Sequence, residues 1–181
     1  MRHVIRYFVA VAALLVAGAI AALLLFFASL PELDGTIEVD GLSANVEIVR
    51  DGFGIPTVRA ETRADLAFGS GFAHAQDRFF QMDLTRRNAA GELAALVGSA
   101  ALPRDRANRL HRFRSRARAV LELASDEERG IVEAYARGVN AGLQSLSARP
   151  FEYFLLGASP QPWQPEDTML VGYAMFLDLT D

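Results

Sequence analysis

Apolar and polar positions divide the chain into three regions. Residues Phe8 to Leu30 include no charged side chain. These apolar or small residues predict a helix that crosses a bilayer, because such a helix needs roughly 20 residues. Residues 31–35 contain Pro31 and Gly35 and predict a short linker. In residues 36–181, strand-like stretches are followed by helix-like ones, which predicts an α+β body in which helices dominate.

The first region, residues 1–30, has three possible interpretations. Arg2 and Arg6 precede the apolar stretch and Glu32 follows it, a charge order that predicts an inside N-terminus and an outside body. The length favours an uncleaved membrane anchor. A cleaved signal peptide is the alternative, although residues 28–30 are a poor cleavage site, and a buried core helix is the third. The first two predict export of everything from residue 31 onward, and the anchor leaves the exported body membrane-attached.

Three short strands are predicted at the start of the body. Thr36–Val39 and Ala44–Arg50 flank the turn at residues 40–43, and Ile55–Arg59 is the third strand. Pro56 lacks a backbone donor, so it is expected at a strand start or on an edge. Two or three strands this short do not make an independently stable sheet. Therefore either helices cover these strands, or the strands join a sheet formed by polypeptide that is not part of this sequence.

Helical spacing covers most of the remaining sequence. Thr62 and Asp65 predict an N-cap with a capping box. Gly69 and Gly71 predict either a close approach of another backbone or a break in the helix, because glycine is unfavourable in a helix interior. We expect the helix to break there. The expected helices are 62–68, 72–87, 93–97, 106–123, 125 to about 146 (with a capping box at Ser125 and Glu128) and 166–179, with a loop or short helix at 149–157.

Composition narrows the possible chemistry. The chain has no cysteine, which excludes a thiol nucleophile and thiolate metal sites. All 18 basic residues are arginines, and without Arg2 and Arg6 the body has 16 of them against 22 carboxylates, a formal net charge of −6. Nucleic-acid-binding domains are normally basic, so we expect no nucleic-acid partner. The arginine-rich stretch Arg104–Arg118 predicts a solvated helix face or a contact with a partner chain.

No catalytic constellation is evident in the sequence. Ser70 lies between two glycines, but the nucleophile elbow requires Gly-x-Ser-x-Gly, which the sequence does not match. Ser70 is therefore expected to be a small residue at a helix contact. His74 has no marked nucleophile partner, and the histidines lack metal-ligand spacing. We assign no catalytic residue and predict no metal site within the chain.

For two further groups of residues, structural packing is the first interpretation and a chemical role the second. Asp77-Arg78, Arg86-Arg87 and Glu92 predict a charged network, in which Asp77 accepts an arginine or backbone donors. Aromatic residues gather near the proline-rich turn and predict packing there, with the lining of an apolar ligand pocket as the alternative. These aromatic residues are Phe151, Tyr153, Phe154 and Trp163.

Several blocks, taken in order, resemble the N-terminal part of the penicillin acylase (penicillin amidase) family of N-terminal-nucleophile hydrolases. The similarity extends over about residues 36–181. Gly69–Met82 resembles the family's most characteristic segment. The other blocks are Val46–Pro56, Arg86–Gly98, Tyr135–Ala141, Pro150–Tyr153 and Pro162–Asp167.

The resemblance implies a four-layer αββα sandwich made by two chains cut from one precursor. The second, β-chain begins with a serine nucleophile whose own α-amino group is the base. The implied activity is amide hydrolysis of hydrophobic N-acyl compounds such as β-lactams, acyl-homoserine lactones or lipopeptides. That serine would lie beyond Asp181, so we expect an incomplete α-chain portion whose partner is the remainder of the precursor. The alternative is a membrane-anchored, non-catalytic binding or scaffold module, or a truncated inactive product.

The resemblance also implies one wall of the acyl pocket. A gapless extension from Trp163 places this wall at Phe176 and Thr180, and a one-residue slip would substitute Met175 and Leu179. Plain core packing is the alternative for Met175 and Phe176. No cofactor is required; calcium is implied by the family, with its glutamate ligand falling past residue 181.

Overall fold

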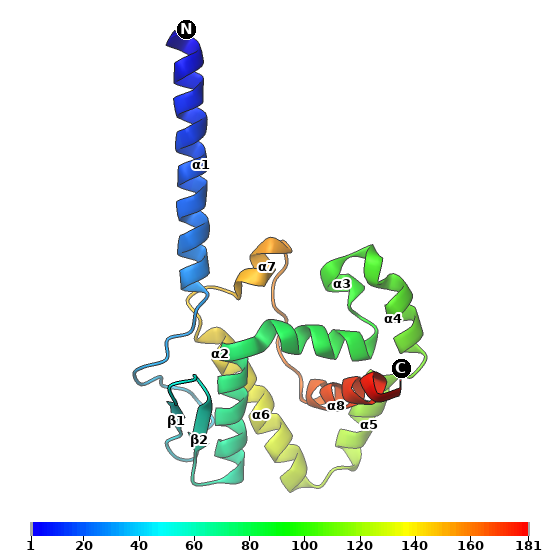
Figure 1. Cartoon of the computed structure of the whole chain (residues 1–181). Coiled ribbons are helices and arrows are strands. Elements are labelled where there is room, and N and C mark those ends of the chain that lie inside the picture. Colours follow the sequence, from blue (N-terminus) through cyan, green and yellow to red (C-terminus); the bar gives the residue numbers. More distant parts are fainter. Residues whose placement is uncertain (1, 181) are drawn as a thin grey trace.

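The computed structural model describes residues 2–180. Helix α1 (Arg2–Ala28) projects as a rod from a mainly helical body (Figure 1). The body begins with strands β1 (Glu47–Arg50) and β2 (Pro56–Arg59). Its helices are α2 (Arg63–Ala90), α3 (Ala94–Val97), the 3-10 turn η1 (Ser99–Ala101), α4 (Leu102–Arg109), α5 (Phe113–Leu123), α6 (Asp126–Gln144), α7 (Phe151–Leu155) and α8 (Pro165–Thr180).

Helix α1 has the length and composition of a membrane span. The most apolar 18-residue window within His3–Ala28 has a mean hydropathy of 2.8, and none of this window is buried against the body. The interpretation as a buried core helix is therefore wrong. A signal sequence and an anchor are both consistent with this helix.

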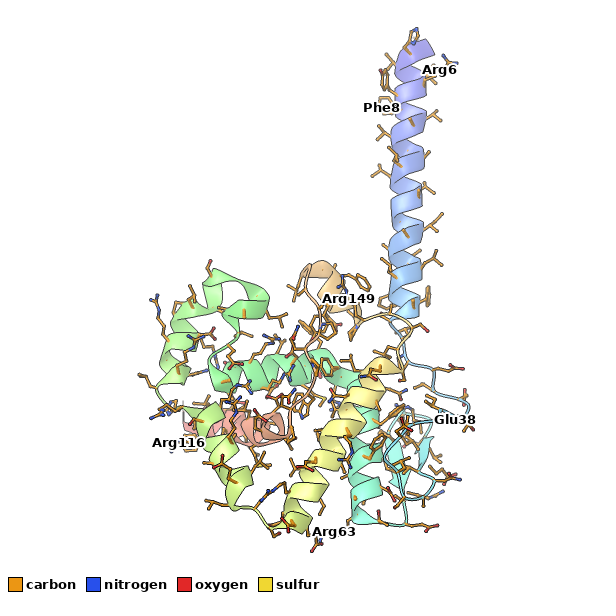
Figure 2. The ribbon with its side chains drawn as sticks, turned by 180° about the vertical axis from the view of Figure 1, so that it is seen from behind. Arg6, Phe8, Glu38, Arg63, Arg116 and Arg149 are labelled. Atoms are coloured by element: carbon orange, nitrogen blue, oxygen red, sulfur yellow. The ribbon has the colours of Figure 1, made fainter. Side chains whose placement is uncertain are left out.

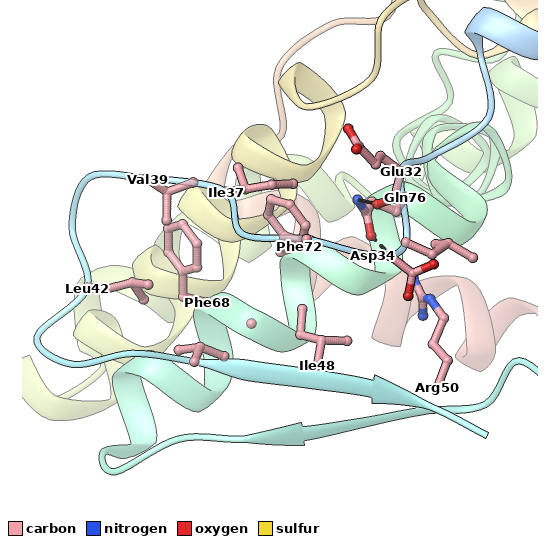
Figure 3. Close-up of a pocket in the computed structure, with 14 residues that line it drawn as sticks. Glu32, Asp34, Ile37, Val39, Leu42, Ile48, Arg50, Phe68, Phe72 and Gln76 are labelled. Carbon is pink, nitrogen blue, oxygen red and sulfur yellow. Dashed lines mark hydrogen bonds between the residues drawn. The ribbon is translucent and has the colours of Figure 1, made fainter.

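The two strands form an antiparallel ladder in which Glu47 pairs with Arg59 and Arg50 with Pro56. Pro56 is the first residue of its strand, as predicted. The expected strand at Thr36–Val39 is wrong. This segment runs across α2 without a ladder partner and places Ile37 and Val39 near Phe68 and Phe72 (Figure 3).

Helix α2 begins at the predicted N-cap, because Thr62 Oγ1 accepts a hydrogen bond from Asp65 N at 3.1 Å. The Asp65 carboxylate does not act as the capping box predicts. It accepts hydrogen bonds from the backbone N–H and the hydroxyl of Ser43, and these lower its pKa. Asp65 thus fixes the segment before β1 to the start of α2.

Helices α2 and α6 are in backbone contact through glycines. A Cβ on Gly71 would lie 2.3 Å from Tyr135 O, and one on Gly138 would lie 2.0 Å from Phe68 O. The prediction of close approach is thus confirmed, but a break at the paired glycines is wrong. The helix continues through them and is irregular at Arg78, whose φ and ψ are −155° and 29°. There α2 changes direction (Figure 1), so that its first arm packs on α6 and its second reaches α8.

The arginine-rich stretch is two helices and not the single one expected. Helices α4 and α5 are separated at Arg112, which has a left-handed conformation (φ 52°) that is uncommon outside glycine. Asp105 explains the position of α4, because its carboxylate accepts the backbone N–H groups of Leu93 and Ala94 at 2.9 and 2.8 Å. The turn then directs Phe113 into the core beneath α8.

Helix α6 begins with the predicted capping box. Ser125 Oγ accepts from Glu128 N, while the Glu128 carboxylate accepts from Ser125 N at 2.9 Å. The Ser125 hydroxyl also donates to the Glu128 carboxylate at 2.7 Å, and this hydrogen bond, followed by the one from Ser125 N, lowers the pKa of Glu128.

Candidate functional site

Three of the residues expected to line the acyl pocket lie on the solvent-facing side of α8. Met175, Phe176 and Leu179 are 65%, 50% and 79% exposed. Val171 is also exposed, and with Met175 and Leu179 it forms a row at four-residue spacing on one helix face. We call Val171, Met175, Phe176 and Leu179 the α8 outer face. The side chain of Thr180 lies outside the described part of the structure.

The opposite side of α8 holds the helix on the body. Leu170, Ala174 and Leu177 are buried with Phe113 and Ala117 in one apolar cluster. The Phe176 ring meets Phe113 edge-on, with centroids 6.2 Å apart, and the residue as a whole is half exposed. Met175 and Phe176 are therefore not fully buried core residues in the described structure.

A buried carboxylate fixes the first turn of α8. Asp167 is 1% exposed and accepts hydrogen bonds from Arg86 at 2.5 Å and Arg114 at 2.9 Å. It also accepts from Gln164 N at 2.8 Å, which caps the helix. Arg114 additionally makes two hydrogen bonds to Glu92. Burial alone lowers the pKa of Arg114, but the hydrogen bonds to Glu92 and Asp167 outweigh it and raise that pKa overall.

Arg86 is the centre of this ion cluster. Its side chain is 4% exposed, and its Nε donates to Asp83 at 2.7 Å. It also donates to the carbonyls of Gln161 and Pro162, and its guanidinium lies 5.0 Å from the Trp163 ring centroid. One arginine on α2 therefore fixes both the proline-rich loop and the start of α8.

Asp83 completes the cluster on the α7 side. Its carboxylate accepts from Arg87 Nε at 2.8 Å and from the Tyr153 hydroxyl at 2.7 Å. Burial raises the pKa of Tyr153, and the hydrogen bond to Asp83 raises it further. Tyr153 and Trp163 are fully or almost fully buried, so the predicted aromatic packing around this turn is confirmed for both.

The charged network differs in part from the one predicted. Arg86, Arg87 and Glu92 do belong to the ion cluster, but Asp77 pairs separately with Arg50 at 2.8 Å. The prediction missed Asp83, Asp167 and Arg114. The signal for Asp83 was present, because it lies three and four residues before Arg86 and Arg87, the spacing at which helical side chains meet.

The Tyr153–Asp83 hydrogen bond predicts a particular response to alkali. The pKa of Tyr153 is raised, so the folded state holds the phenol proton more tightly than the unfolded chain does. The resulting stabilisation is complete below about pH 10, the ordinary tyrosine pKa, and is lost as pH rises further. Tyr153→Phe should lower the free energy of unfolding by about 1–3 kcal/mol near pH 7. Its melting temperature, followed from pH 7 to 11, should fall less steeply than that of the wild-type protein; parallel curves would contradict this role.

The other candidate groups do not assemble a catalytic site. The Ser70 hydroxyl donates to the Leu66 carbonyl one turn earlier at 2.8 Å. His74 Nδ1 lies 2.9 Å from the Tyr135 hydroxyl, and burial, followed by the positive charge of Arg78, lowers the pKa of His74. These contacts give neither side chain a nucleophile–base geometry.

The described residues also do not fit a calcium ion. No group of three or more acidic or histidine side chains in residues 2–180 is arranged to hold a metal. The buried carboxylates of Asp83 and Asp167 already accept hydrogen bonds from arginine, tyrosine or backbone donors.

A small cavity of about 140 Å³ lies between the segment before β1, β1 itself and α2 (Figure 3). Ile48, Phe68 and Phe72 make its apolar part, and Gln76 and Arg50 lie at its polar end. Arg50 already donates hydrogen bonds to Gln76 and Asp77, so it has a structural role and is not free to bind an anion.

Comparison with known proteins shows to which family this chain belongs. Residues 45–181 match the family described as Penicillin amidase, and the chain belongs to that family. It is 44% identical over 144 residues to penicillin acylase 2 proenzyme of Pseudomonas sp. (strain SE83), covering 80% of this chain and 19% of that protein. It is 39% identical over 144 residues to the acyl-homoserine lactone acylase QuiP of Pseudomonas aeruginosa, covering 79% of this chain and 17% of that protein.

A solved structure agrees with this relationship. Thermostable penicillin G acylase from Alcaligenes faecalis has a chain that superposes with a TM-score of 0.68 at 32% identity, covering 75% of this chain and 74% of that one. The chain thus spans about a fifth of the length of the curated relatives it matches, while it is similar in extent to this one solved chain. It is related to penicillin acylases and acyl-homoserine lactone acylases, and the described residues include no assembled nucleophilic centre.

Proposed function

We propose that these residues are the N-terminal part of an exported amide hydrolase of the αββα class, completed by a second chain from the same precursor. The single observation that carries the proposal is the family match over residues 45–181. The two-stranded sheet is compatible with it, because α2 covers one face of this short ladder while Glu47, Val49, Thr57 and Arg59 on the other face remain exposed and could meet further strands. One matched relative is named a proenzyme, which agrees with a precursor that is cut.

In this proposal the second chain supplies the reacting groups. Its N-terminal serine hydroxyl attacks the amide carbonyl, and its α-amino group, with an ordinary pKa of about 7.7–8.0, takes the hydroxyl proton. The C–N bond then breaks, the amine leaves with that proton, and an acyl ester remains on the serine. The same α-amino group then takes a proton from water, the resulting hydroxide attacks the ester, and the proton passes to the serine oxygen as the acid is released.

The residues of this chain would bind and position the substrate. The α8 outer face offers Met175, Phe176 and Leu179 to a hydrophobic acyl group, and Thr180 is proposed at its end. The ion cluster around Arg86 holds this helix at its first turn through Asp167. The wall is apolar, so the proposed substrates are hydrophobic N-acyl compounds such as β-lactams, acyl-homoserine lactones or lipopeptides.

The pocket wall is tested by introducing charge on the α8 outer face. Met175→Asp and Phe176→Asp should each lower kcat/KM for hydrophobic acyl amides by about 10- to 100-fold, the equivalent of losing one buried apolar side chain. The assay is amide hydrolysis by the assembled enzyme. Leu123→Asp is the matched control, because Leu123 is 87% exposed at the end of α5 and should leave the activity unchanged. A normal kcat/KM in both α8 variants would show that α8 is not part of the acyl site.

A non-catalytic membrane module, or a truncated inactive product, is the other candidate. The reading frame beyond Asp181 separates the two. A long continuation with a serine at a processing junction supports the hydrolase, and a genuine stop supports the module.

The N-terminal apolar helix is suited to a signal or an anchor, so export of the body is plausible. We propose that it is retained and that the body faces the periplasm or the exterior, because Arg2 and Arg6 precede the span and Glu32 follows it. Resistance of the protein to extraction from membranes by alkaline carbonate tests this retention.

A further inference from the structure

Helix α7 and the residues just before it contact the C-terminal end of α1. The ring centroids of Phe26 and Phe151 are 5.4 Å apart, and Ala148 N donates a hydrogen bond to Ala28 O at 2.9 Å. Ser29, immediately after α1, is 8% exposed. Side-chain packing and a backbone hydrogen bond therefore fix the position of α7 relative to the apolar rod.

The outer side of α7 is apolar. Leu155 is 80% exposed, and Leu156 and Phe151 are 40% and 39% exposed. We call these three residues the α7 tip. The other side of the helix is anchored in the body, because Tyr153 is fully buried and donates to Asp83. A cluster of large apolar side chains on a rigidly held helix marks an interaction surface.

The position of the α7 tip indicates what it contacts. Figures 1 and 2 are related by a half-turn about the vertical direction along which α1 extends, and in both α7 lies at the level where α1 meets the body. Arg149, next to α7 in sequence, is close to that level in Figure 2, while Arg63 is at the opposite end of the body. A bilayer crossed by α1 would have its surface at this level, because the apolar span ends at Ala28.

We propose that the α7 tip inserts into the headgroup–acyl boundary of the bilayer that α1 crosses. Apolar side chains on a short surface element are suited to that boundary, and the tip is continuous with the span through Phe26 and Phe151. The body would then be held by two points, α1 and α7, and would not turn freely on residues 31–35. Helix α8 lies further from the bilayer than α7 in both views, so the α8 outer face would be kept away from lipid. This inference rests on the proposed retention of α1.

The test uses the absence of cysteine from these residues. Leu155→Cys is introduced into the full natural polypeptide, with any thiol elsewhere replaced by alanine, and is labelled with the environment-sensitive fluorophore NBD. The protein is reconstituted in vesicles of phosphatidylethanolamine and phosphatidylglycerol containing lipids spin-labelled near the headgroup. Leu123→Cys is the matched control, because it is a similarly exposed leucine that lies four residues before Glu127, the partner of Arg63 at the far end of the body. A label at Leu156→Cys provides a second position on the α7 tip.

The α7-tip labels should show blue-shifted emission and lose at least half of their fluorescence to the spin-labelled lipid, and the Leu123→Cys label should lose less than a tenth. Equal, weak quenching at all positions would overturn the proposal. A blue shift at the α7 tip without lipid quenching would also overturn it, because the tip would then be covered by protein. Extraction of the protein by carbonate would also overturn the proposal, but through its premise, because α1 would then not cross the bilayer.

Discussion

Replacing Asp167 with alanine is expected to lower the free energy of unfolding by about 3–5 kcal/mol, the cost of removing one partner from a buried ion cluster. Arg86 is 4% exposed and would lose one of its two carboxylate partners, while Arg114 would keep only Glu92. The start of α8 would also lose the cap that Asp167 gives to Gln164 N. Denaturant unfolding of the assembled protein measures the effect.

Glu166→Ala is the matched control for this variant. Glu166 is the neighbouring residue and pairs with Arg118; the Arg118 side chain is 62% exposed and the Glu166 side chain is 13% exposed. Because solvent reaches the arginine of this pair, its contribution should be about 0–1 kcal/mol, and this variant should lose much less stability than Asp167→Ala. If the two variants lose equal stability, the buried cluster does not hold α8 in the way described here.

The second large effect is expected from Gly138→Ala in α6. The added methyl group would lie 2.0 Å from the Phe68 carbonyl oxygen, and that neighbour is backbone and so has no rotamer to change. Helices α2 and α6 must then separate. Overpacking costs about 1–3 kcal/mol and occasionally more, and we expect at least the upper value here. Loss of soluble, processed protein, or a lowered unfolding midpoint, is the readout.

Gly130→Ala supplies the control on the same helix. A Cβ at Gly130 meets no atom within 4 Å, and alanine is favoured over glycine in a helix interior by about 1 kcal/mol. This variant should be neutral or slightly more stable than the wild-type protein. Similar tolerance of alanine at Gly138 would show that the two helices do not touch as closely as the structure has them.

Local sequence signals predicted the features that depend on neighbouring residues. The caps at Thr62 and Ser125, Pro56 at the start of β2 and the family blocks all depend on short spacings. The paired glycines correctly predicted close approach, but they did not break α2, because Val46 and Val58 pack against it at Gly69 and the α6 backbone packs against it at Gly71. The break lies at Arg78, where α2 changes direction.

The missed features depend on contacts between distant segments. Arg114 was assigned to a solvated or partner-facing stretch, but it reaches Asp167, more than fifty residues away in the chain, and this contact gives no local pattern. The predicted strand at Thr36–Val39 has no ladder partner among the described residues, so its extended backbone packs on α2 instead. The exposure of the α8 outer face likewise follows from the contacts of its buried side with α5.

We propose that a second chain completes this fold and carries the attacking hydroxyl. Intact-mass and N-terminal sequence measurement of the protein purified from its natural source tests it most directly. Two associated chains are expected, the smaller containing these residues and the larger beginning with a serine. This proposal would be contradicted by a single polypeptide that ends at Asp181 and hydrolyses amides unaided.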